Sequence, residues 1–88
     1  MKVEVEITAC NFVKELPIKS RRIILKQLRK LEDPFQVSEI EKIGRDVYRL
    51  HIGRTYTVFF LIYPERDLVR VTDILPIETA HKRYYRFA

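Results

Sequence analysis

The chain has 88 residues, with 17 Lys or Arg against 12 Asp or Glu, so its formal net charge is +5. This length fits one domain over residues 1–88, and the apolar fraction of 47% excludes an intrinsically disordered chain. Because the longest apolar run, residues 58–63, is too short to span a bilayer and the single cysteine cannot form an internal disulfide, we expect a cytoplasmic protein without a membrane partner.

Alternating residues predict a strand at the start of the chain, followed by a short helix. From residue 2 to residue 7, lysine or glutamate alternates with valine or isoleucine. A period of two with one charged face is typical of a half-exposed strand at the edge of a sheet. Thr8 then predicts the N-cap of a short helix that begins at Ala9 and ends before Pro17.

A longer helix is predicted over residues 18–31. Ile24, Leu28 and Leu31 recur at helical spacing, and Leu25 is expected to widen this apolar stripe. Basic residues fill the other side of the helix, and the pair at 33–34, Asp-Pro, ends it. The two helices, joined by a tight turn, form a helical hairpin.

The second half of the chain predicts three antiparallel strands. We expect an irregular connection over residues 32–45, and then a strand over residues 46–52 that alternates between two faces. Residues 56–63 are apolar on both faces and predict a central strand. A turn at residues 64–67 leads into the last strand, residues 68–75.

The predicted fold class is therefore α+β. An N-terminal strand and a two-helix hairpin precede a three-stranded antiparallel meander, and all strands form one sheet packed on the helices. The segment from Ile77 to the end of the chain is a tail dense in basic and aromatic residues. Its side chains could stack on nucleic-acid bases or pack the tail onto the sheet, and the sequence leaves both interpretations open.

Two residues on the predicted strand 46–52 are candidates for chemistry. Arg49 and His51 share one face because side chains alternate along a strand. Arg49 could hold a phosphate through its forked donors, or pair with an acidic residue such as Asp73. His51 and His81 are the only histidines and titrate near neutrality, so they could exchange protons with a substrate or be ordinary surface residues.

Other chemistries find little in the sequence to support them. The chain has only two glycines and therefore no Gly-rich phosphate loop. It also has no Cys/His spacing of the zinc-binding kind. We therefore expect no metal site and no small-molecule cofactor.

The segment of residues 47–60, VYRLHIGRTYTVFF, resembles the RelE/ParE toxin superfamily. Members show a strand with tyrosine, arginine, aliphatic residues and glycine, followed by a second strand that opens with tyrosine. Leu16-Pro17 before the long helix and Asp33-Pro34 after it also match, so the resemblance covers nearly the whole chain. It implies a RelE-like fold and the toxin of a type II toxin–antitoxin system, with a cognate antitoxin protein as partner.

The resemblance also implies a reaction. Nuclease members of the superfamily cut messenger RNA on the ribosome without a metal, through attack of the ribose 2′-hydroxyl on the adjacent phosphate. This metal-independent endoribonuclease chemistry needs a proton acceptor, a proton donor and cations beside the phosphate. Carried over to this chain, the catalytic candidates are Arg49, His51, His81 and Tyr84. The candidates for binding RNA phosphates are Arg54, Lys82, Arg83 and Arg86.

Two positions depart from the pattern of the nucleases. Thr57 and Ile77 stand where those members carry arginines that grip the scissile phosphate. We therefore expect weakened cleavage if the chain is a nuclease. Two alternatives remain open: a ParE-like toxin that binds DNA gyrase and does no chemistry, and a catalytically inactive module that binds antitoxin or RNA.

Overall fold

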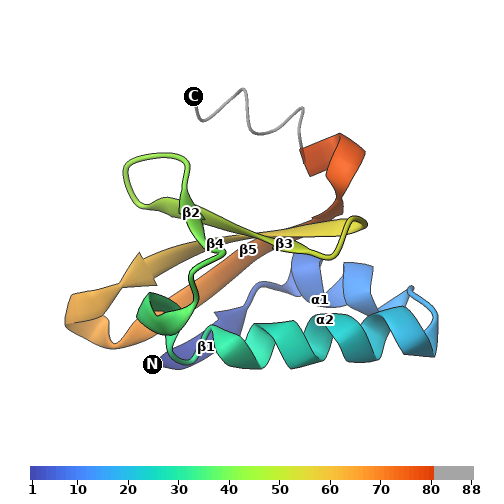
Figure 1. Ribbon diagram of the computed structural model, residues 1–88. Helices are drawn as coiled ribbons and strands as arrows, with labels where there is room; N and C mark the ends of the chain where they lie inside the picture. Colours follow the sequence, from blue (N-terminus) through green and yellow to red (C-terminus); the bar gives the residue numbers. More distant parts are fainter. Residues whose placement is uncertain (81–88) are drawn as a thin grey trace.

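A five-stranded sheet with two helices on one face makes up the molecule (Figure 1). The computed structural model describes residues 1–80 of the 88. In chain order its elements are β1 (Lys2–Val5), α1 (Ile7–Lys14), α2 (Ile18–Lys30), a 3-10 helix (Pro34–Gln36), β2 (Glu41–Lys42), β3 (Val47–Ile52), β4 (Tyr56–Tyr63), a second 3-10 helix (Pro64–Arg66) and β5 (Leu68–Pro76). The strand order is β1-β5-β4-β3-β2. The α+β class, the helical hairpin and the meander of β3, β4 and β5 are thus confirmed.

The core lies between α2 and the sheet. Ile24 and Leu31 are 0% exposed and Leu28 is 8% exposed, so these three predicted positions of the helical stripe are buried. Leu25, however, is 48% exposed, and its predicted place in the stripe is wrong. Successive helix residues are turned by about 100°, so Leu25 points sideways from the sheet when Ile24 faces it.

Aromatic side chains join β3 and β4 to this core. Phe60 on the central strand is fully buried, and its ring stacks on Tyr48 with 5.9 Å between the ring centroids. Tyr56 meets Phe12 of α1 edge to face, also at 5.9 Å. Tyr48 and Tyr56 are therefore partly buried and packed against the core, and β4 is the middle strand of the sheet that its two apolar faces predicted.

The first strand agrees with its prediction, and the first helix differs from its prediction in detail. β1 is an edge strand as expected, and it pairs parallel to β5. The first helix begins at Ile7, and its N-cap is Glu6, which makes no side-chain cap hydrogen bond. Thr8 therefore lies inside the helix, and its hydroxyl donates to the carbonyl of Thr72 on β5 at 3.4 Å. The hydroxyl that predicted a cap instead joins α1 to the sheet.

Arg21 of α2 donates hydrogen bonds to the C-terminal end of α1. The Nη2 atom of Arg21 donates to the carbonyl oxygens of Lys14 and Leu16, at 2.9 and 3.1 Å. The last carbonyls of a helix lack partners within the helix, so a cationic donor stabilises this end. Within residues 1–80, no helix is both long and apolar enough to cross a membrane.

A two-residue edge strand, β2, lies in the segment that the sequence predicted to be irregular. Glu41 pairs with Arg49, and Lys42 pairs with Tyr48. Both β2 residues are charged and exposed, so no apolar alternation marks them as a strand. Their pairing follows from the adjacent turn, in which the N–H groups of Ile43 and Gly44 both donate to the carbonyl of Val47.

Candidate functional site

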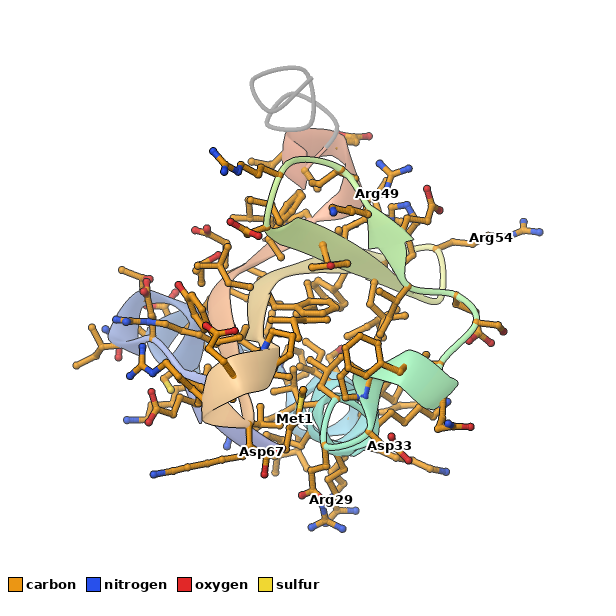
Figure 2. The ribbon with its side chains drawn as sticks, turned by 90° about the vertical axis from the view of Figure 1, so that its left-hand side faces the viewer. Met1, Arg29, Asp33, Arg49, Arg54 and Asp67 are labelled. Carbon is orange, nitrogen blue, oxygen red and sulfur yellow. The ribbon has the colours of Figure 1, made fainter. Side chains whose placement is uncertain are left out.

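Two of the candidate residues, Arg49 and His51, lie on the face of the sheet that points away from α1 and α2. We call this surface the outer face and define it by Arg49, His51, Thr57, Phe59 and Asp73. Directly paired strand residues share a face, and the register pairs Arg49 with Phe59, Phe59 with Asp73, and His51 with Thr57. Figure 2 shows Arg49 on the opposite side of the molecule from Arg29 of α2. The period of two thus brings Arg49 and His51 together as predicted.

Arg49 forms an ion pair across β2 and β3. Its Nη2 atom lies 2.8 Å from Oε2 of Glu41, its direct neighbour in the strand register. The Arg49 side chain is 16% exposed and the Glu41 side chain is 53% exposed. Asp73, which the sequence named as an example of an acidic partner, is on β5, with Phe59 of β4 between it and Arg49 in the register. Glu41, whose carboxylate is at hydrogen-bond distance from Arg49, comes from β2, a strand that the sequence did not predict.

His51 is held by a buried hydroxyl. Its Nδ1 atom lies 2.7 Å from Oγ1 of Thr57, and Thr57 is 0% exposed. Which of the two atoms donates depends on the tautomer of the imidazole. In either case the bond sets the orientation of the ring. Thr57, which departs from the nuclease pattern, is therefore joined to the candidate histidine.

Other candidate residues lie apart from this pair or outside the described residues. Arg54 is exposed in the turn after β3, and its side chain extends away from the body of the molecule (Figure 2). The N–H of Ile77 donates to the carbonyl of Thr55 at 2.9 Å. From there, residues 77–80 form a helical turn on the side of the sheet opposite to α1 and α2 (Figure 1). The remaining candidates, His81, Lys82, Arg83, Tyr84 and Arg86, lie outside the described residues.

The outer face brings together groups suited to binding an anion and transferring a proton. A guanidinium offers paired donors to a phosphate, and an imidazole can accept or donate a proton near neutral pH. Across residues 1–80, no cluster of three or more His, Cys, Asp or Glu is placed to hold a metal ion. Sequence reasoning missed Glu41, because its role follows from strand register and not from a motif.

Comparison with known proteins identifies the fold. No protein-family model matches the sequence, and no curated protein matches it either. Solved structures do match. The archaeal RelE–RelB complex from Pyrococcus horikoshii OT3 superimposes with a TM-score of 0.75 at 20% identity, covering 85% of this chain and 92% of the other. The isolated RelE toxin of E. coli gives a TM-score of 0.70 at 17% identity, covering 92% and 95%. The chain has the RelE fold.

A third structure extends the range of this likeness. The toxin–antitoxin complex RelBE2 from Mycobacterium tuberculosis matches with a TM-score of 0.71 at 16% identity, covering 83% of this chain and 93% of that one. Such identities are too low for residue roles to be transferred by similarity alone. The RelE fold of this chain confirms the architecture that the sequence predicted. The candidate residues Arg49 and His51 have to be judged from their own geometry.

Proposed function

We propose that this chain is the toxin of a type II toxin–antitoxin pair and acts as a RelE-like, ribosome-dependent mRNA endonuclease of weakened activity. One observation carries the proposal. In a RelE fold, Arg49 and His51 share the outer face of β3, on the side of the sheet where residues 77–80 lead into the basic tail. The last eight residues would supply His81 and Tyr84 to the same reaction.

The proposed reaction uses the RNA's own 2′-hydroxyl as nucleophile, so it requires no metal. Arg49 would stabilise the negative charge that builds on the attacked phosphate, because its guanidinium is always charged and donates in pairs. His51 would accept or donate the proton, with its ring oriented by the Thr57 hydroxyl 2.7 Å away. Lys82, Arg83 and Arg86 would add positive charge along the RNA backbone.

The weakening follows from position 57. A threonine hydroxyl carries no charge, and this one is fully buried and engaged with His51. It therefore orients the histidine without adding a cation to the phosphate. Removing one preorganised donor from such a site typically lowers the rate by about 100-fold or more. We expect cleavage that is slower than in members with arginine at this position.

A protein antitoxin is the proposed partner. An apolar groove of about 220 Å³ between α1 and α2 is lined by Val13, Leu25 and Leu28, with Lys14 and Arg21 beside it. An acidic amphipathic segment fits it, because leucine-like side chains would cover the groove while carboxylates meet the two cations. Leu25→Glu should weaken binding of a small acidic protein encoded beside this gene. Phe35→Glu, a change at another exposed apolar residue, should leave binding intact.

Expression of the chain alone tests the nuclease proposal. We expect growth arrest accompanied by codon-linked cuts in messenger RNA on ribosomes, and both should be relieved by coexpression of the antitoxin. Normal growth with intact transcripts, at a verified protein level, would contradict the proposal.

The gyrase-binding alternative predicts a different outcome. The solved structures described above are RelE toxins and RelE complexes, which does not favour a ParE-type function. A supercoiling assay separates the two, since a ParE-like toxin inhibits gyrase at micromolar protein and leaves transcripts uncut. An inactive binding module would give neither effect.

A further inference from the structure

The ion pair between Glu41 and Arg49 places a carboxylate where the proposed function requires a phosphate. Oε2 of Glu41 lies 2.8 Å from Nη2 of Arg49, at the distance of a charge-assisted hydrogen bond. The register holds the two residues directly opposite each other, so the contact is built into the pairing of β2 with β3. Carboxylate and phosphate oxygens bind a guanidinium with the same geometry.

We propose that Glu41 is an internal competitor for Arg49, so that an RNA phosphate binds this arginine only by displacing the Glu41 carboxylate. The inference rests on the proposed function in taking RNA phosphate as the ligand of Arg49. It adds that Glu41 determines which anions can bind Arg49. A lone anion must replace an ion pair that is already formed, whereas an RNA strand brings further phosphates to neighbouring cations and offsets that cost.

The surroundings of the pair allow Glu41 to leave while Arg49 stays. Glu41 belongs to a two-residue strand at the sheet edge, and its side chain is 53% exposed, so water can solvate the released carboxylate. Arg49 comes from β3, which is flanked by β2 and β4, and only 16% of its side chain is exposed. Because water reaches the carboxylate side of this ion pair, the pair is weaker than a fully buried one, and displacement lies within reach of an incoming phosphate.

Binding of a short labelled oligouridylate to the full chain tests the competition. Glu41→Gln removes the charge and keeps the shape, and it should tighten binding by about threefold, a factor typical of a partly exposed ion pair. Glu39→Gln is the matched control, because it removes the same charge from an exposed residue two positions away whose carboxylate contacts Ser38. We expect it to change affinity by no more than about 1.5-fold, as screening reduces distant charges.

Introducing Arg49→Ala into the unaltered chain and into Glu41→Gln shows whether the gain in RNA affinity depends on Arg49. If Glu41 acts through Arg49, the gain from Glu41→Gln disappears once the arginine is gone. Salt dependence gives a second readout. The Glu41 carboxylate offsets one of the positive charges that the protein brings to the RNA, so Glu41→Gln should make the slope of log affinity against log salt steeper, by up to about 0.7 for single-stranded RNA.

Failure of this inference can be told apart from failure of the proposed function. Unchanged or weaker RNA binding by Glu41→Gln would overturn the competition, and weaker binding would mean that Glu41 positions Arg49. If Arg49→Ala leaves RNA binding unchanged both in the unaltered chain and in Glu41→Gln, RNA is not the ligand of Arg49, and the proposed function, which needs that contact, fails. Inorganic phosphate, followed through the Arg49 side-chain NMR signal, then tests the competition alone. Glu41→Gln should respond at lower phosphate than the unaltered chain, and an identical response would refute the inference.

Discussion

The helical side of the molecule and the outer face of the sheet differ in whether acidic residues accompany their positive charges. α2 contains six cations and no acidic residue, namely Lys19, Arg21, Arg22, Lys26, Arg29 and Lys30. On the outer face, Arg49 is paired with Glu41, and Asp73 lies in the same cross-strand register. Figure 2 shows Arg29 and Arg49 on opposite sides of the molecule. The six cations of α2 therefore lie on the helical side, away from the candidate site, and the net charge of +5 did not by itself indicate where the site lies.

The two sides also bury different kinds of side chain. The helix-covered face holds the apolar core, in which Phe60 is 0% exposed. The outer face buries Phe59 to 1% exposure, but beside it lies the buried hydroxyl of Thr57 with its bond to His51. We therefore expect stability to depend chiefly on the first face and orientation of the candidate residues on the second.

Truncating the core should have the largest effect on stability. Phe60→Ala removes a fully buried ring and its stacking on Tyr48, and it should lower the free energy of unfolding by about 3–5 kcal/mol. Denaturant-induced unfolding measures the change. Phe35→Ala, at a phenylalanine that is 65% exposed, is the control and should cost less than about 0.5 kcal/mol. Similar losses for both variants would contradict the assignment of the core.

On the outer face, Thr57→Val should have an intermediate effect. Valine has nearly the shape of threonine but leaves the Nδ1 atom of His51 without its hydroxyl partner, at a cost of about 1–2 kcal/mol. The histidine NMR signals should shift as the ring loses this contact. Thr55→Val, at an exposed position of the preceding turn, should change neither quantity. An unaltered His51 spectrum in Thr57→Val would show that the bond is not formed in solution.

The smallest effect is expected at the end of α1. Arg21→Ala removes the donor to the carbonyls of Lys14 and Leu16 and should lower stability by about 1 kcal/mol. The neighbouring Arg22 is exposed, so Arg22→Ala should be close to neutral. Thermal unfolding of both variants compares a cation that supports the fold with one that contributes only charge. Equal effects would mean that the helix-end contact contributes nothing.

Much of this comparison could be predicted from the sequence, because periodicity is a local signal. Three of the four residues in the stripe predicted over residues 18–31 are buried as spacing predicted, and the alternation in β3 placed Arg49 and His51 on one face. The prediction for Leu25 was wrong because spacing alone does not give the width of the buried stripe. Periodicity found the faces, but it could not say how wide each one is.

The rest depended on strand register, which the pattern of single segments does not contain. Nothing in Glu41-Lys42 resembles a strand, yet this pair supplies the carboxylate that meets Arg49. In the same way, the sequence showed only that Thr57 stands where nuclease members carry an arginine. The strand register places it opposite His51, where its hydroxyl hydrogen-bonds to the imidazole. Partners brought together by tertiary pairing were therefore missed, while their strand neighbours were found.

The most direct test compares mRNA cleavage on ribosomes by Arg49→Ala and Arg66→Ala. Both changes remove one cation, but Arg66 lies in the turn between β4 and β5, where it stacks on Tyr63. We predict that Arg49→Ala lowers the cleavage rate by about 100-fold or more, while Arg66→Ala cleaves like the unaltered chain. Equal cleavage by the two variants would contradict the assignment of the outer face as the site of reaction.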